Sequence, residues 1–259
     1  MRLKDKVAVV TGAGQGIGEV IAIEMAREGA RVVLAARTEK NLQRTAEKIA
    51  AAGGEALVVP TDVTDEDSIR NMVKKTMDEC GALDILVNNS GVAGPMKAME
   101  ELSREEWEEC FDVNVTGMFL CCKHVIPAMK AARAGRIINI SSMSGKRPLI
   151  HRSPYTASKM AVIGLTRTLA FELGEYGVTV NAVCPGATEG ERIRRVIEND
   201  AKARNVTYEE AEAGFTSAAA LKRFVRSEDT AAMCIFLCSE EGKNMTGQDI
   251  NVTAGLCWY

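Results

Sequence analysis

The chain has 259 residues, of which 46% are hydrophobic and 26% are charged, and its formal net charge at pH 7 is −3. This length is enough for one α/β domain with a full core, and the small net charge argues against nucleic acid or an anionic membrane surface as a partner. Because the N-terminus lacks a long apolar region and no apolar stretch approaches the roughly 20 residues that span a bilayer, we expect a cytoplasmic protein.

Short β-branched runs alternate with helical patterns along the chain. The runs predicted to be strands are residues 7–10, 31–35, 56–59, 84–88, 136–140, 178–183 and 249–252. The helical patterns between them include Glu39–Ala52, Asp65–Cys80 and Ser103–Ala131. Strands that are apolar throughout and alternate with helices predict a parallel sheet covered on both faces.

No linker, repeat or low-complexity tract interrupts this pattern, which predicts a single domain over residues 1–259. Residues 187–224 depart from it, because they are rich in charge and lie between the sixth and seventh predicted strands. We expect one or two short helices in this segment. Long excursions of this kind are often lids or binding loops, so a substrate lid is predicted, with a surface helix pair as the alternative.

The chain contains eight cysteines but no C-x-x-C motif. Cys121 and Cys122 are adjacent, and Cys234 and Cys238 have the i,i+4 spacing of a helix. This spacing favours reduced cysteines packed as small hydrophobic residues. We therefore expect neither a metal site nor catalysis by a thiolate.

A glycine-rich turn, VAVVTGAGQGIG, joins the first predicted strand to a helix. Glycines permit a tight turn and let backbone N–H groups approach a pyrophosphate, which the helix N-terminus favours electrostatically. The position after a strand, before a helix and at the start of a βαβ unit is the context that a dinucleotide site requires. The residues expected to bind the cofactor here are Gly12, Gly14, Gln15, Gly16, Ile17 and Gly18.

The end of the second predicted strand indicates which dinucleotide is bound. An acidic residue there would accept a hydrogen bond from the ribose 2′-hydroxyl, but the sequence has Ala36 followed by Arg37. An arginine suits a 2′-phosphate, which it can bind through charge-assisted hydrogen bonds. NADP(H) is therefore favoured and NAD(H) remains possible, the alternative being that Arg37 is an ordinary solvated loop residue.

Six motifs follow one another in the chain: TGAGQGIG (11–18), NNSG (88–91), NV (114–115), ISS (140–142), YTASK (155–159) and PG (185–186). In this order they resemble the short-chain dehydrogenase/reductase family, and the resemblance covers nearly the whole chain. It implies a Rossmann-type, doubly wound α/β fold, with a seven-stranded parallel sheet and helices on both faces. It also implies a homotetramer or homodimer.

The YTASK motif places Tyr155 and Lys159 four residues apart, on one face of a predicted helix. A free tyrosine, with a pKa of about 10, is a poor base near neutral pH, but a neighbouring ammonium favours the phenolate. The resemblance implies that Tyr155 is the general acid/base and that Lys159 is its electrostatic partner and binds the nicotinamide ribose. It further implies that Ser142 binds the substrate oxygen, whereas Ser141 points to the other side of the strand, and that Asn114 holds a water for proton relay.

The resemblance also assigns cofactor contacts. Asp62 matches the residue that binds the adenine amino group, and Val63 matches the one that packs on the ring. Asn88 is expected to steady the sheet. The other positions expected to line the cofactor are Asn89, Ser90, Gly91, Pro185, Gly186 and Thr188.

Two positions differ from the usual pattern of the family. Ser90 stands where alanine is common, and Gly190 stands where many relatives have a threonine that binds the nicotinamide carboxamide. Thr188 or backbone groups are the alternatives for this carboxamide contact.

These features predict an NADP(H)-dependent alcohol dehydrogenase or ketone reductase acting on a small alcohol or carbonyl compound. A 3-oxoacyl-[acyl-carrier-protein] reductase is the second hypothesis, although the basic patch that an acidic carrier protein needs is mixed with glutamates near Lys130 and Arg133. A dinucleotide-binding regulatory module that has lost catalysis is a hypothesis of another class. The cations expected at the rim of the substrate pocket are Lys146, Arg147, His151, Arg152, Arg192, Arg194 and Arg195. Of these, Arg147, Arg152 and Arg192 are expected to meet a polar or anionic substrate.

Overall fold

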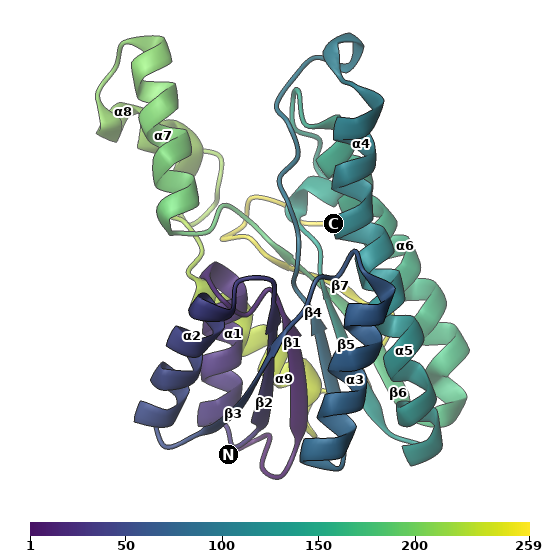
Figure 1. Ribbon diagram of the computed structural model, residues 1–259. Helices are drawn as coiled ribbons and strands as arrows, with labels where there is room; N and C mark the ends of the chain where they lie inside the picture. The colour runs from purple at the N-terminus through teal and green to yellow at the C-terminus, as the bar shows by residue number, and fades with distance from the viewer.

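A computed structural model describes the backbone of residues 1–259 and the side chains of all of them except residues 192, 199 and 203. Seven parallel strands form one sheet in the order β3-β2-β1-β4-β5-β6-β7 (Figure 1). The strands are β1 (Val7–Thr11), β2 (Arg31–Ala36), β3 (Glu55–Pro60), β4 (Ile85–Asn88), β5 (Gly135–Ile140), β6 (Val178–Pro185) and β7 (Asp249–Val252). The predicted fold class and the predicted strands are confirmed.

Helices cover both faces of this sheet (Figure 1). They are α1 (Gly16–Arg27), α2 (Glu39–Ala51), α3 (Glu66–Cys80), α4 (Arg104–Phe111), α5 (Gly117–Ala132), α6 (Ser153–Leu173), α7 (Glu191–Arg204), α8 (Tyr208–Thr216) and α9 (Ser227–Cys238). One apolar core lies between the sheet and α1, α2 and α9, and a second lies between the sheet and α3, α5 and α6.

Strand β1 shows why the run Val7–Val10 is apolar throughout. All five of its residues are buried. Ala8 and Val10 belong to the core of α1, α2 and α9, whereas Val7 and Val9 belong to the opposite core. Since successive side chains of a strand point to opposite faces, a sheet covered on both faces requires apolar residues at every position.

The helix predicted over Ser103–Ala131 is confirmed, but it contains a π-helical turn that the sequence pattern did not predict. Helix α4 begins with a capping box, in which the Ser103 hydroxyl accepts a hydrogen bond from the Glu106 backbone N–H and the Glu106 carboxylate accepts one from the Ser103 N–H. A π-helical turn, Asp112–Thr116, then separates α4 from α5. Such turns insert one residue into a helix and are frequent at functional sites. The buried Asn114 lies within this turn.

The charged segment 187–224 forms α7 and α8, as predicted. In Figure 1 both helices stand apart from the sheet and its covering helices. They pack on each other through a small apolar cluster that includes Ile197, Ala201 and Ala211. The segment is closed at its base by two backbone hydrogen bonds, from Glu189 to the Val225 carbonyl (2.8 Å) and from Val225 to the Ala187 carbonyl (2.9 Å).

The eight cysteines are free thiols, and all except the half-buried Cys80 are buried. Burial raises the pKa of Cys122 and that of Cys238 to about 12. These thiols therefore pack as small hydrophobic groups, as predicted. In the part of the chain that the structure describes, no three His, Cys, Asp or Glu side chains come together in a way that could hold a metal ion. No described helix is long and apolar enough to cross a membrane.

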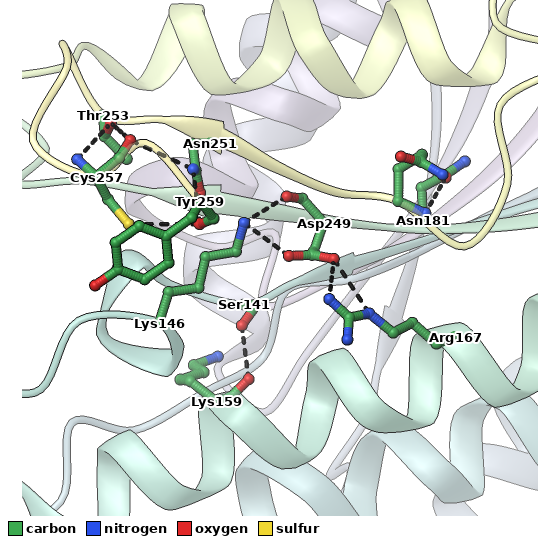
Figure 2. Close-up of polar contacts among 11 residues, drawn as sticks. Ser141, Lys146, Lys159, Arg167, Asn181, Asp249, Asn251, Thr253, Cys257 and Tyr259 are labelled. Atoms are coloured by element: carbon green, nitrogen blue, oxygen red, sulfur yellow. Dashed lines mark hydrogen bonds and ion pairs between the residues drawn. The ribbon is translucent and has the colours of Figure 1, made fainter.

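A polar cluster ties β7 to the segment that follows β5 (Figure 2). The Lys146 ammonium lies 2.7 Å from Asp249 Oδ2 and donates a hydrogen bond to the Asp249 carbonyl (2.6 Å), while Arg167 donates to Oδ1 (2.8 Å). Burial raises the pKa of the Asp249 carboxyl, but the hydrogen bonds and charges of Lys146 and Arg167 outweigh it and hold that pKa below its ordinary value. Lys146 therefore faces the protein interior, and its expected place on the pocket rim was wrong.

Lys146→Met should lower the free energy of unfolding by about 1.5–3 kcal/mol, the range for a lost hydrogen bond to a charged group, because Asp249 keeps only the exposed Arg167 as a counter-charge. Arg167→Met is the control, since its side chain is 62% exposed and should contribute less than about 1 kcal/mol. Urea unfolding measures both. Equal losses of unfolding free energy in the two variants would contradict the larger contribution that we assign to Lys146.

The same cluster predicts a pH dependence. Because the folded pKa of Asp249 lies below its ordinary value of 3.8, the carboxylate stabilises the fold above that value. This stabilisation is lost as the pH falls through the lower folded pKa. The difference in unfolding free energy between the parent and Asp249→Asn should therefore shrink as the pH falls below about 4.

Candidate functional site

The residues singled out in the sequence gather at the carboxyl ends of β1, β4, β5 and β6. Tyr155 and Lys159 belong to α6, Ser142 follows β5, and Asn114 comes from the turn between α4 and α5. Ligands of open α/β sheets bind outside the carboxyl ends of the strands, so this edge is the expected place for a site.

Tyr155 and Lys159 share a face of α6, as their spacing predicts. The Lys159 ammonium lies 5.8 Å from the centroid of the Tyr155 ring and donates a hydrogen bond to the Ile140 carbonyl (2.9 Å). Lys159 is only 4% exposed. The Ser141 hydroxyl donates to the Lys159 carbonyl (2.8 Å; Figure 2) and so fixes α6 against the end of β5.

Ser142 is buried at the carboxyl end of β5, where a short 3-10 turn begins. Its hydroxyl accepts a hydrogen bond from the Ser144 backbone N–H (3.1 Å) and donates one to the Ser144 hydroxyl (3.1 Å). Ser144, which we did not single out in the sequence, thus orients this hydroxyl. The spacing S-x-S was the only signal for it.

Asn114 is fully buried and holds the segment after β4. Its Oδ1 accepts a hydrogen bond from the Val92 N–H (2.8 Å), and its Nδ2 donates to the Val92 carbonyl (3.0 Å) and to the Ser158 hydroxyl (3.0 Å). A Cβ on Gly91 would lie 3.1 Å from Asn114 Oδ1 and 3.5 Å from Lys159 Nζ. Gly91 therefore lies close to both the asparagine and the lysine. Ser158 is a second residue that sequence reasoning missed.

The glycine-rich turn is built around Asn89. The Asn89 amide donates to the carbonyls of Thr11 (3.0 Å) and Gly12 (3.3 Å), and the Thr11 hydroxyl accepts hydrogen bonds from the N–H groups of Asn89 and Ser90. A Cβ on Gly18 would lie 2.2 Å from the Asn89 amide nitrogen and 2.4 Å from the Gly12 carbonyl oxygen. Only glycine fits there, and the bare turn at the N-terminus of α1 suits a pyrophosphate.

Two groups mark the adenosine end that we predicted. Hydrogen bonds from Thr64, above all the one from its backbone N–H, hold the pKa of Asp62 below its ordinary value. The positive charge of Arg37 also lowers this pKa. Arg37 is exposed directly after β2, and α2 begins two residues later. Val63 is buried and packs against Gly117 of α5. Arg44, which we missed, donates to the Gly14 carbonyl (3.3 Å).

The turn after β6 explains one departure from the family pattern. Gly186 donates to the Val252 carbonyl (2.9 Å), and the Thr188 hydroxyl donates to the Gly186 carbonyl (3.1 Å). Gly190 has φ of 145°, a conformation that side chains rarely adopt, and directly precedes α7. The path of the chain into α7 therefore accounts for the glycine at this position, where many relatives have a threonine.

The cations expected at the pocket rim occupy different places. Arg147 and His151 are exposed, as are Arg194 and Arg195 of α7. Arg192 lies outside the described side chains. Arg152 is half-buried, and its guanidinium carbon lies 5.1 Å from the centroid of the Tyr155 ring.

Comparisons with known proteins agree with this geometry. A family model described as "short chain dehydrogenase" matches residues 6–201. The chain is 41% identical over 255 residues to "Granaticin polyketide synthase putative ketoacyl reductase 1" of Streptomyces violaceoruber, with 98% of this chain and 93% of that protein covered. It is 35% identical to a 3-oxoacyl-[acyl-carrier-protein] reductase of Staphylococcus epidermidis, with 97% and 99% covered.

Two solved structures superpose on almost the whole chain. A variant of actinorhodin polyketide ketoreductase with NADPH has a TM-score of 0.93 and 38% identity, with 98% of each chain covered. NAD⁺-bound xylitol dehydrogenase has a TM-score of 0.93 and 28% identity, with 98% of this chain and 100% of that chain covered.

Gly18→Ala should weaken NADPH binding at least about tenfold, because the added methyl group would displace the Asn89 amide and deform the turn. Gly164→Ala is the matched control, since a Cβ on this helical glycine meets nothing within 4 Å. Fluorescence titration with NADPH measures the affinity, and circular dichroism reports whether each variant is folded. A folded Gly18→Ala variant with parental affinity would rule out this turn as the dinucleotide site.

Proposed function

Because the chain belongs to the short-chain dehydrogenase family, and is therefore an NAD(P)-dependent oxidoreductase acting on CH–OH groups, we propose that it interconverts a secondary alcohol and a ketone with NADP(H). The observation that carries the proposal is the buried ammonium of Lys159, which lies on one helix face with Tyr155 and, like Asn114, lies beside Gly91. A ketone, NADPH and a proton give the alcohol and NADP⁺, and the reverse reaction releases the proton.

The residues at the carboxyl edge of the sheet fit a dinucleotide. The turn from Gly12 to Gly18 would hold the pyrophosphate, Asp62 the adenine, and Pro185 with Gly186 the nicotinamide end. When bound, the nicotinamide supplies or accepts the hydride. The protein supplies the proton and orients the reacting oxygen.

Tyr155 is proposed to donate the proton to the ketone oxygen, or to remove it from the alcohol. The Lys159 ammonium stabilises the phenolate that this transfer leaves, and the electrostatic effect is strong because the ammonium is buried. Ser142, whose hydroxyl Ser144 orients, would bind the substrate oxygen. Asn114 would hold a water between Lys159 and solvent, from which the phenol regains its proton.

The preference for NADP(H) rests on Arg37. Its guanidinium lies at the end of β2, two residues before the first turn of α2, whose N–H groups also favour a phosphate. No acidic residue occupies the neighbouring position, which is Ala36. The NADPH of the ketoreductase at 38% identity agrees with this preference, whereas the NAD⁺ of the xylitol dehydrogenase is found at 28% identity.

A 3-oxoacyl-[acyl-carrier-protein] reductase is the second candidate, favoured by the similarity to ketoacyl reductases. The cations that could meet an acidic carrier protein are engaged locally. Lys130 lies 4.3 Å from the Tyr176 ring centroid, and Arg133 donates to the Glu175 carbonyl (2.7 Å). This arrangement favours a small free substrate. The presence of all four proposed catalytic residues supports an active enzyme over a regulatory module.

We further propose a homodimer or homotetramer with α5 and α6 in its interface. Phe119, Met160 and Phe171 of these helices expose their side chains, and Phe171 is 92% exposed. Exposed apolar side chains of this kind mark association surfaces.

The eight free thiols agree with the reducing cytoplasm. The segment 187–224 is proposed to cover the bound substrate, since it follows directly on the nicotinamide-facing turn.

Tyr155→Phe should reduce kcat for ketone reduction by about 100- to 10,000-fold while NADPH affinity stays within threefold of the parent, because the ring remains but the proton donor is lost. Tyr176→Phe is the matched control. Tyr176 lies after α6, beside Lys130 and away from Lys159. Activity of Tyr155→Phe within tenfold of the parent would remove Tyr155 from the acid/base role.

Arg37→Asp should lower the ratio of kcat/KM for NADPH to that for NADH at least about tenfold, since it replaces a charge-assisted phosphate contact with a repulsive carboxylate. Lys40→Asp changes the net charge equally from an exposed position in α2 and should alter the ratio much less. Steady-state kinetics with both cofactors provide the measurement. A similar ratio in the two variants would show that Arg37 does not contact the 2′-phosphate.

A further inference from the structure

A second cation lies beside the proposed catalytic phenol. Arg152 directly precedes α6, three residues before Tyr155, and its guanidinium carbon is 5.1 Å from the centroid of the Tyr155 ring. The Lys159 ammonium is at 5.8 Å from the same centroid. The substrate oxygen must contact the Tyr155 hydroxyl for proton transfer, and the guanidinium lies beside the ring that carries this hydroxyl.

The position of Arg152 is fixed by contacts between two loops. Its Nη2 donates to the Ala93 carbonyl (3.0 Å) in the loop after β4. The preceding residue, His151, has a φ of 59° and accepts a hydrogen bond from the Lys97 N–H (3.1 Å) of the same loop. A left-handed conformation is uncommon for a residue other than glycine, and the surrounding structure must hold it. The first bond joins the guanidinium to the loop after β4, and the second joins the backbone of the preceding residue to the same loop.

Other described cations nearby are directed elsewhere. Lys146 is turned inward to Asp249. Lys97 lies 2.5 Å from Glu106 on the surface, and Arg147 is exposed. Arg152 thus combines proximity to Tyr155 with partial burial, which strengthens its interaction with an anion because less water screens the charge.

We propose that Arg152 selects substrates that carry an anionic group, a carboxylate or another oxyanion, within a few bonds of the reacting carbon. A guanidinium binds such groups through paired, charge-assisted hydrogen bonds and stays protonated at any pH that the enzyme meets. Arg152 remains beside Tyr155 when the substrate is neutral. Its recognition of an anionic group should therefore affect substrate binding, measured as KM, rather than the proton transfer. This proposal rests on the proposed function, because it assumes that the reacting oxygen meets Tyr155.

Matched pairs of keto acids and their methyl esters test the proposal, because each pair differs by the charge and one methyl group. The pairs are pyruvate, acetoacetate and levulinate with their methyl esters, which place the acid at three distances from the ketone. NADPH oxidation gives kcat and KM for the parent and for three variants: Arg152→Met, Arg152→Lys and Arg104→Met. Arg104→Met is the control, since it removes an exposed arginine of α4 that pairs with Glu108 on the surface.

The parent should have a higher kcat/KM for the acid than for the ester in at least one pair. In that pair, Arg152→Met should raise KM for the acid about 10- to 100-fold and KM for the ester less than threefold, as expected for a lost charge-assisted contact. The KM of Arg152→Lys for the acid should lie between those of the parent and of Arg152→Met, because lysine keeps the charge but not the planar guanidinium. Arg104→Met should match the parent.

Two results would overturn the proposal. One is a parent that prefers the ester in all three pairs. The other is an Arg152→Met variant whose KM rises equally for acid and ester, which would mean that the arginine only supports the loop after β4. Failure of the proposed function is a separate result, since it would show as no turnover of any ketone by the parent, or as Tyr155→Phe retaining parental activity on the esters.

Discussion

The burial of one ammonium group, that of Lys159, is the constraint on which the site depends. Transfer of a charge from water into a protein is costly unless hydrogen bonds and polar groups replace the water. The Ile140 carbonyl accepts a hydrogen bond from this ammonium at the end of β5. Gly91 has no side chain, so that the segment after β4 can pass close to the ammonium and to Asn114. The ammonium is thereby placed beside the Tyr155 ring, 5.8 Å from its centroid.

The parallel sheet explains how residues from distant parts of the chain reach this charge. Each strand ends at the same edge, so the segments after β4, β5 and β6 meet there although the helices between them are long. Ser141 and Ser142 illustrate the period of two along a strand. The Ser141 hydroxyl anchors α6, whereas the Ser142 hydroxyl lies on the other side and is oriented by Ser144. One strand end therefore supplies both the support of the helix and the hydroxyl that we propose for substrate binding.

Local patterns predicted the helices and strands well where one interaction dominates. Asp65 caps α3, as expected, by accepting a hydrogen bond from the Asp67 N–H (2.9 Å). The π-helical turn within the helix predicted over Ser103–Ala131 has a non-local cause. Asn114, which lies in this turn, makes hydrogen bonds to Val92, 22 residues away, and to Ser158. The periodicity of the sequence alone does not reveal such a partner.

The sequence alone determined the alternating α/β pattern, the glycine-rich turn and the pairing of Tyr155 with Lys159, because each depends on spacing within a few residues. The surroundings of each charge depended on the tertiary structure. Lys146 and Arg152 both belong to the segment between β5 and α6. Both are basic residues, so the sequence alone does not distinguish their surroundings. The fold directs Lys146 to Asp249 of β7, 103 residues away, and directs Arg152 to the Tyr155 ring. Partners so distant in the chain are brought together only by the packing of the sheet, and that packing decides which cation pairs with Asp249 and which one lies beside Tyr155.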